Sequence, residues 1–106
     1  MTPSELNSRR EQYDGQVVRV KGWLQIQFED IGLLDLKRSY DEPHGVDWPS
    51  TCVSLRGGLL ENVGHYSGPA IVTGTFRMHI LPPDVVSNGV CNETGIEISK
   101  IDKLDP

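Results

Sequence analysis

The feature that most constrains the fold is a run of alternating apolar and polar residues that begins near residue 17. The apolar members of this run are Val18, Val20, Leu24 and Ile26. A period of two is typical of a β-strand with one face buried. Gly22 interrupts the run, and a glycine inside a bulky strand commonly marks a bulge or a sharp bend at a barrel corner. The sequence therefore predicts a long, bent strand over about residues 16–27.

Four further segments have strand-like patterns, and one N-terminal segment has a helical start. The additional strands are predicted over about residues 32–40, 51–56, 69–81 and 95–101, with Leu34 and Leu36 of the second strand facing inward. Thr2 can cap a helix and Pro3 suits its first position, which predicts a short helix over about residues 3–11 that packs as a lid or plug. Between the third and fourth strands there is room for a turn or one short helix, from Leu59 to Val63.

The first and fourth strands share a local pattern. Residues 13–22 (YDGQVVRVKG) and 66–74 (YSGPAIVTG) both run from Tyr-x-Gly through an apolar stretch to a second glycine. With five strands and a long, glycine-bent first strand, these phrases resemble small bacterial OB-fold domains of unassigned function, over roughly residues 13–104. The resemblance implies an all-β, five-stranded OB-fold-like barrel with a short N-terminal helix, one domain over residues 1–106, and a generic binding face.

Composition limits the partners. The chain has 106 residues, an ordinary apolar content and a net charge of -5. Nucleic acids are bound chiefly through Lys and Arg, so the acidic balance disfavours nucleic acid without excluding it. No apolar stretch is long enough for a membrane helix, and the N-terminus lacks the pattern of a signal peptide. We therefore expect no membrane association and a cytoplasmic location by default, or a periplasmic one if a signal peptide has been removed.

The predicted binding face consists of strands two and three with the adjoining loops. The candidate ligand-binding residues are Arg19, Lys21, Trp23, Lys37, Arg38, Tyr40, Trp48 and Arg56. The leading hypothesis is a non-catalytic binding module, existing as a monomer or weak homodimer, that takes a protein or peptide partner, because large aromatic residues dominate interface energetics. The alternative is binding of single-stranded nucleic acid or an oligosaccharide on the same face, where bases stack on rings and cations follow phosphates.

No motif indicates catalysis. His65 and His79 have no nearby partner in a known catalytic pattern, and Arg56-Gly57-Gly58 lacks the lysine and length of a phosphate-binding loop. The acidic loop around His44 matches no defined metal-binding spacing. We predict no enzymatic activity, no cofactor and no metal.

The two cysteines, Cys52 and Cys91, match neither a zinc nor a redox motif. In an OB-fold barrel the third and fifth strands run parallel side by side, and the two cysteines would lie at the same end of these strands. The resemblance thus makes Cys52 and Cys91 candidates for a disulfide, against the alternative of two reduced thiols.

Overall fold

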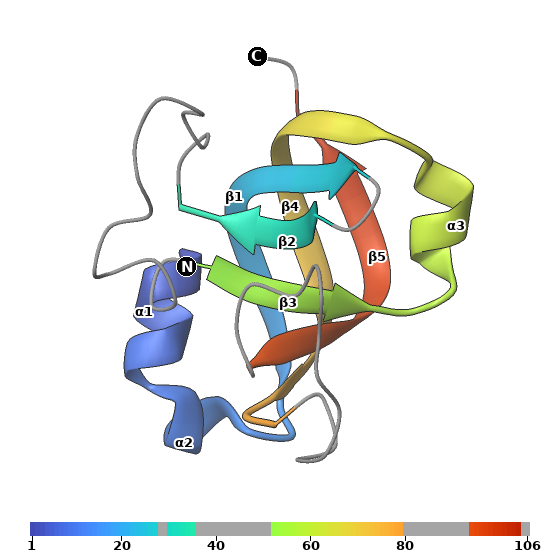
Figure 1. Cartoon of the computed structure of the whole chain (residues 1–106). Helices are drawn as coiled ribbons and strands as arrows, with labels where there is room; N and C mark the ends of the chain where they lie inside the picture. The colour runs from blue at the N-terminus through green and yellow to red at the C-terminus, as the bar shows by residue number, and fades with distance from the viewer. Residues whose placement is uncertain (28–29, 36–51, 80–93, 105–106) are drawn as a thin grey trace.

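The fold is a closed barrel of five strands, seen in a computed structural model that describes residues 1–27, 30–35, 52–79 and 94–104 (Figure 1). The strands are β1 (Val17–Gln27), β2 (Asp30–Leu34), β3 (Cys52–Arg56), β4 (Tyr66–Arg77) and β5 (Gly95–Lys103). They close in the order β1-β2-β3-β5-β4, with β3 and β5 parallel to each other and the other neighbouring strands antiparallel. The fold is therefore an all-β small barrel, compatible with an OB-like fold.

The largest difference from the predicted strands concerns β2. It ends at Leu34, with a bend at Asp35, whereas the sequence predicts a strand over 32–40; residues 36–40 lie outside the described part. The side chain of Asp35 accepts a hydrogen bond from the backbone N–H of Ser4, so this residue holds the N-terminal segment instead of continuing the ladder. β4 begins at Tyr66, three residues earlier than predicted, because its first residues pair with the second half of β1.

The barrel interior is filled by alternate residues of all five strands. The buried core cluster contains Leu6, Val18, Val20, Leu24, Ile26, Leu33, Val53, Ala70, Val72, Phe76 and Ile96. The inward residues predicted for β1 are confirmed. For β2 the predicted register is wrong by one residue, since Leu33 pairs with the inward Leu24 and enters the core. Leu34 is buried on the outer side, opposite Trp23 and Cys52. Two adjacent leucines leave the alternation ambiguous, and a slip of one residue exchanges the faces.

Two strand glycines occur where neighbouring backbones approach closely. A Cβ atom on Gly22 would collide with the carbonyl oxygen of Leu34 on β2, and one on Gly74 would collide with the carbonyl oxygen of Glu97 on β5. Next to Gly74 the β4–β5 register shifts, because Ser99 is an extra residue on β5. These two glycines end the phrases shared by the first and fourth strands, so the internal likeness reflects sites of close backbone contact.

The N-terminal segment forms two short helices rather than one, α1 (Pro3–Ser8) and α2 (Arg10–Tyr13). The predicted start is confirmed: Pro3 occupies the first turn, and the Thr2 side chain accepts a hydrogen bond from the Glu5 N–H. The predicted continuation to residue 11 is wrong. The Ser8 hydroxyl donates to the Glu5 carbonyl, the acceptor that the Arg9 N–H would use in a continuous helix, and the Arg9 N–H donates to Leu6 instead.

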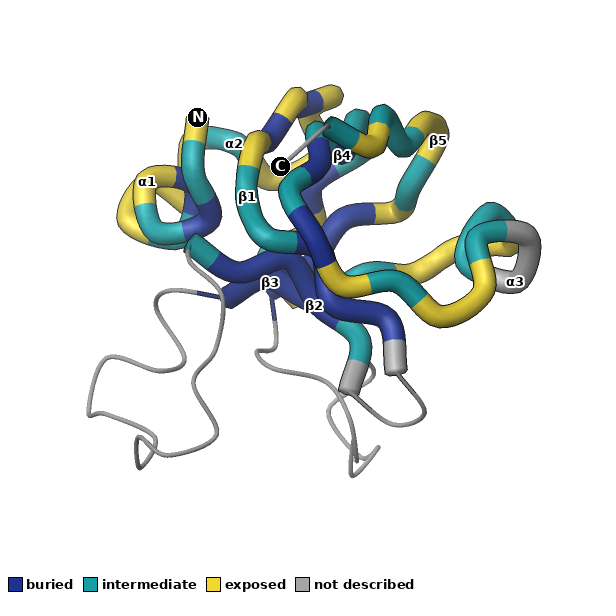
Figure 2. Tube along the Cα trace, turned by 90° about the horizontal axis from the view of Figure 1, so that it is seen from above, coloured by how far each residue is buried: buried dark blue, intermediate teal, exposed yellow. Residues whose placement is uncertain are grey.

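Helix α1 is anchored to the barrel by apolar and polar contacts. Leu6 is completely buried in the core cluster. Asn7 donates through Nδ2 to the carbonyl of Cys52 on β3 (3.0 Å) and accepts from the hydroxyl of Thr94, just before β5 (2.6 Å). In Figure 2 the buried side of α1 turns toward the dark blue strands, while much of its outer side is exposed.

The third helix, α3 (Leu59–Val63), connects β3 to β4 at the residues that the sequence predicts. It ends at Gly64, whose φ of 69° is a left-handed conformation that favours glycine. None of the helices in the described part of the chain has the length and apolar character needed to span a bilayer.

Candidate functional site: the Trp23 groove

The outer face of β1 carries a row of alternate residues that the core does not use. Val17, Arg19 and Lys21 are exposed, and Trp23 is half-buried. Their cross-strand partners on β4 are Thr75, Thr73, Ile71 and Pro69. Three of the predicted ligand-binding residues, Arg19, Lys21 and Trp23, therefore share one face, as the period of the strand requires.

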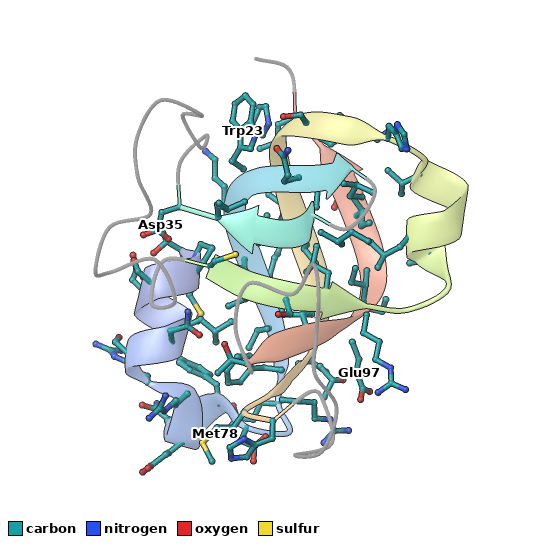
Figure 3. The ribbon with its side chains drawn as sticks, in the orientation of Figure 1. Trp23, Asp35, Met78 and Glu97 are labelled. Carbon is teal, nitrogen blue, oxygen red and sulfur yellow. The ribbon has the colours of Figure 1, made fainter. Side chains whose placement is uncertain are left out.

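The indole of Trp23 is held by a short chain of hydrogen bonds. Its Nε1–H donates to the hydroxyl of Ser67 on β4 (3.0 Å), and that hydroxyl donates to Oε1 of Gln25 (3.0 Å). Gln25 is buried, with only 6% of its surface exposed, so the chain ends on a fixed group. In Figure 3 the Trp23 side chain projects outward from the barrel at its upper end. Trp23 is thus a partly exposed aromatic side chain with a defined orientation.

A groove of about 610 Å³ lies beside Trp23, and its wall is largely apolar. The lining residues are Met1, Thr2, Lys21, Gly22, Trp23, Asp35 and Pro69. The N-terminal residues are fixed as one wall because the Lys21 N–H donates to the Met1 carbonyl (2.8 Å). Asp35 secures the same wall through the Ser4 N–H, at 2.9 Å.

The charges on the outer surface of β1, β4 and β5 are unevenly paired. On β4 and β5, Arg77 forms an ion pair with Glu97 (3.5 Å) and Lys100 forms one with Asp102 (3.6 Å). Lys103 lies over the ring of Tyr66, 4.8 Å from its centroid. Among the described residues, the side chains of Arg19 and Lys21 have no such carboxylate or aromatic partner. Two exposed cations thus stand in line with Trp23.

The face of strands two and three, where the sequence places the site, is not open in its described part. Its outward residues Leu34, Cys52 and Ser54 are each no more than 5% exposed, while Arg56 at the end of β3 is exposed. Figure 2 shows β2 and β3 mostly in the colour of buried residues. A ligand therefore finds little accessible surface on these segments, and the accessible groove lies on the β1–β4 side.

Not all predicted site residues come together. Arg56, at the end of β3, pairs with Glu97 of β5, and Figure 3 places Glu97 at the opposite end of the barrel from Trp23. Lys37, Arg38, Tyr40 and Trp48 lie outside the described residues. Sequence reasoning missed Ser67, Asp35 and Pro69. Only the pairing of β1 with β4 and the docking of α1 bring these residues to Trp23, and no sequence motif marks them.

Cys52 is completely buried and is disulfide-bonded. Cys91, the other cysteine of the sequence, lies outside the described residues, so the predicted pairing of the two stays a prediction. Within the described ranges, no three His, Cys, Asp or Glu side chains gather in a way that could hold a metal ion.

Comparison with models of known protein families and with functionally curated proteins finds no match to this chain. The class that the fold and the groove define is a small closed β-barrel with an aromatic-lined surface groove.

Proposed function

We propose that this chain is an OB-fold binding module without catalytic activity, and that it takes a protein or peptide partner in the groove beside Trp23. The observation that carries the proposal is the half-buried indole, held in one orientation at the edge of a largely apolar groove. Tryptophan is enriched among the residues that dominate binding energy at interfaces. The strand order and the parallel β3–β5 pair support the OB-fold assignment.

Rigidity of the site supports the proposal as well. A partner that docks against a mobile side chain must offset about 0.5–1.5 kcal/mol of lost rotamer freedom. The hydrogen bonds from Trp23 through Ser67 to Gln25 restrict the indole before any partner arrives. The bond between Lys21 and Met1 does the same for the opposite wall.

A selection from a library of random linear peptides displayed on phage tests this function. We expect enriched peptides that bind the unaltered chain and bind the Trp23→Ala variant at least about tenfold more weakly, a difference of about 1.4 kcal/mol. Val17→Ala is the matched control, because Val17 lies in the same outward row, is 72% exposed and does not line the groove. Selected peptides that bind both variants equally well, or the absence of enriched peptides, would refute the proposal.

The disulfide of Cys52 supports a second proposal, that the domain works in an oxidising compartment such as the periplasm. Disulfides persist there and are rare in the reducing cytosol. Cys52 is completely buried, so its bond is sheltered from soluble thiols in the folded state. Thiol labelling of the denatured protein isolated from its native compartment, without reductant, should find no free thiol. Stoichiometric labelling would favour the cytoplasm instead.

A further inference from the structure

The strongest unexplained feature of the surface is the line formed by Arg19, Lys21 and Trp23. We infer that this line recognises an acidic linear peptide, with two carboxylates at alternate positions and an apolar side chain two residues further. This inference rests on the proposed function and specifies the chemistry of the partner.

The spacing of the line supports an extended partner. Alternate residues of a strand are about 7 Å apart along its axis, so the two cations and the indole form three points at equal intervals. Alternate side chains of an extended peptide have the same spacing. Such a peptide can place its two carboxylates near the Arg19 and Lys21 side chains while the apolar side chain enters the groove beside Trp23.

The charge pattern supports an acidic partner over a basic or neutral one. The chain carries a net charge of -5, yet its β1 face presents two exposed cations whose side chains have no carboxylate partner among the described residues. By contrast, Lys100 on β5 is already paired with Asp102. Charged groups at the rim of an interface contribute mainly to specificity and association rate, so the cations would select the partner while the groove supplies the apolar contact.

A single-stranded nucleic acid would also present negative charge and rings, but the surroundings disfavour it. The groove wall contains the Asp35 carboxylate, and Asp102 of β5 lies across β4 from Lys21, because both residues pair with Ile71. A phosphate backbone carries a charge at every nucleotide and would meet these carboxylates, whereas a peptide can place neutral residues opposite them.

The test is an NMR titration of the ¹⁵N-labelled chain with blocked synthetic peptides. The probe peptides carry Asp-Ser-Asp-Ser-Leu and its reverse order, because the direction of binding is not fixed by the argument. Control peptides place the two Asp residues side by side, or replace both by Lys. The Trp23 indole signal is assigned with Trp23→Phe, which separates it from that of Trp48.

We expect the spaced acidic peptide, in one of its directions, to shift the Trp23 indole and the amides of residues 19–23 in a saturable way. The double variant Arg19→Glu, Lys21→Glu should weaken this binding by at least about tenfold, because each change removes an attraction and adds a repulsion. The control Arg9→Glu, Arg10→Glu makes the same change in net charge on two exposed residues at the break between α1 and α2, and it should have little effect.

Four results would overturn the inference. One is equal binding of the spaced and the side-by-side peptides; another is equal weakening by the two double variants. The third is tighter binding of a thymidine oligonucleotide with the same number of negative charges, which would assign the face to nucleic acid. Shifts absent with every designed peptide would also count against it. The phage selection decides the proposed function separately, since it places no demand on the charge of the peptide.

Discussion

Gly74 offers the sharpest test of the barrel geometry. A Cβ at this position would collide with the Glu97 carbonyl oxygen and lie 2.7 Å from Cγ2 of Ile96 and 2.9 Å from the Glu97 carbonyl carbon. Ordinary contacts of this kind begin near 3.4 Å, and two of the three opposing atoms belong to the β5 backbone. Gly74→Ala therefore forces β5 to move where the bulge at Ser99 already bends it.

Overpacking of this kind costs about 1–3 kcal/mol, while the loss of glycine freedom in the unfolded chain returns about 0.4–1 kcal/mol. We expect Gly74→Ala to lower the free energy of unfolding by about 1–2 kcal/mol, which corresponds to a fall in Tm of about 4–8 °C per kcal/mol for a small domain. Urea and thermal unfolding followed by circular dichroism measure both quantities.

Gly58→Ala is the matched control. Gly58 has helical backbone angles (φ -64°, ψ -21°), and its Cβ would meet no atom within 4 Å. This variant should be as stable as the original chain or more stable, by up to about 1 kcal/mol. If Gly74→Ala is no less stable than Gly58→Ala, the close approach of β4 to β5 is wrong.

Three further predictions concern the N-terminal helix and the cysteine. Leu6→Ala should lower the free energy of unfolding by about 2–5 kcal/mol, because Leu6 is buried in the core cluster. Glu5→Ala, at an exposed position of the same helix, should lower it far less. Equal urea midpoints for the two variants would contradict the packing of α1 against the core. Asn7→Ala should lower the free energy of unfolding by about 1–3 kcal/mol, because it leaves the buried Thr94 hydroxyl without its acceptor; Asn7→Asp should keep the bond from Thr94 but lose the one to the Cys52 carbonyl. Amide hydrogen exchange around Thr94 measures the loosening, and unchanged protection in Asn7→Ala would contradict the role of this hydrogen bond. Cys52→Ala should lower stability by about 2–4 kcal/mol under oxidising conditions and by much less in reductant, whereas an equal loss in both would show that the bond contributes little.

The sequence predicts the barrel because its signals are local. The alternation of β1 is visible in the chain itself, and the structure confirms its inward positions. The two strand glycines are visible as well, and they lie where a neighbouring backbone approaches closely. The register of β2 is not visible in this way. Leu33 and Leu34 are equally apolar, and the choice between them depends on the pairing of Leu33 with Leu24, a long-range constraint.

The site is predictable only in part, for the same reason. The row on β1 follows from the period of one strand, so Lys21 and Trp23 are correctly expected on one face. Ser67 reaches Trp23 from 44 residues away, and Asp35 meets Ser4 across 31 residues. Neither contact leaves a trace in local composition. The break between α1 and α2 is a third case, because it depends on which donor reaches the Glu5 carbonyl.

The hydrogen bond between Asn7 and Thr94 has a consequence for the time course of folding. It joins residues 87 positions apart, so a nascent chain cannot seat its first helix on the finished barrel until residue 94 has left the ribosome. At a synthesis rate of roughly 5–20 residues per second, Asn7 would stay without its partner Thr94 for several seconds. Such dependence on distant contacts is typical of slow-folding β topologies. A nascent-chain assay should therefore find protease resistance of the N-terminal helix only after β5 has been made.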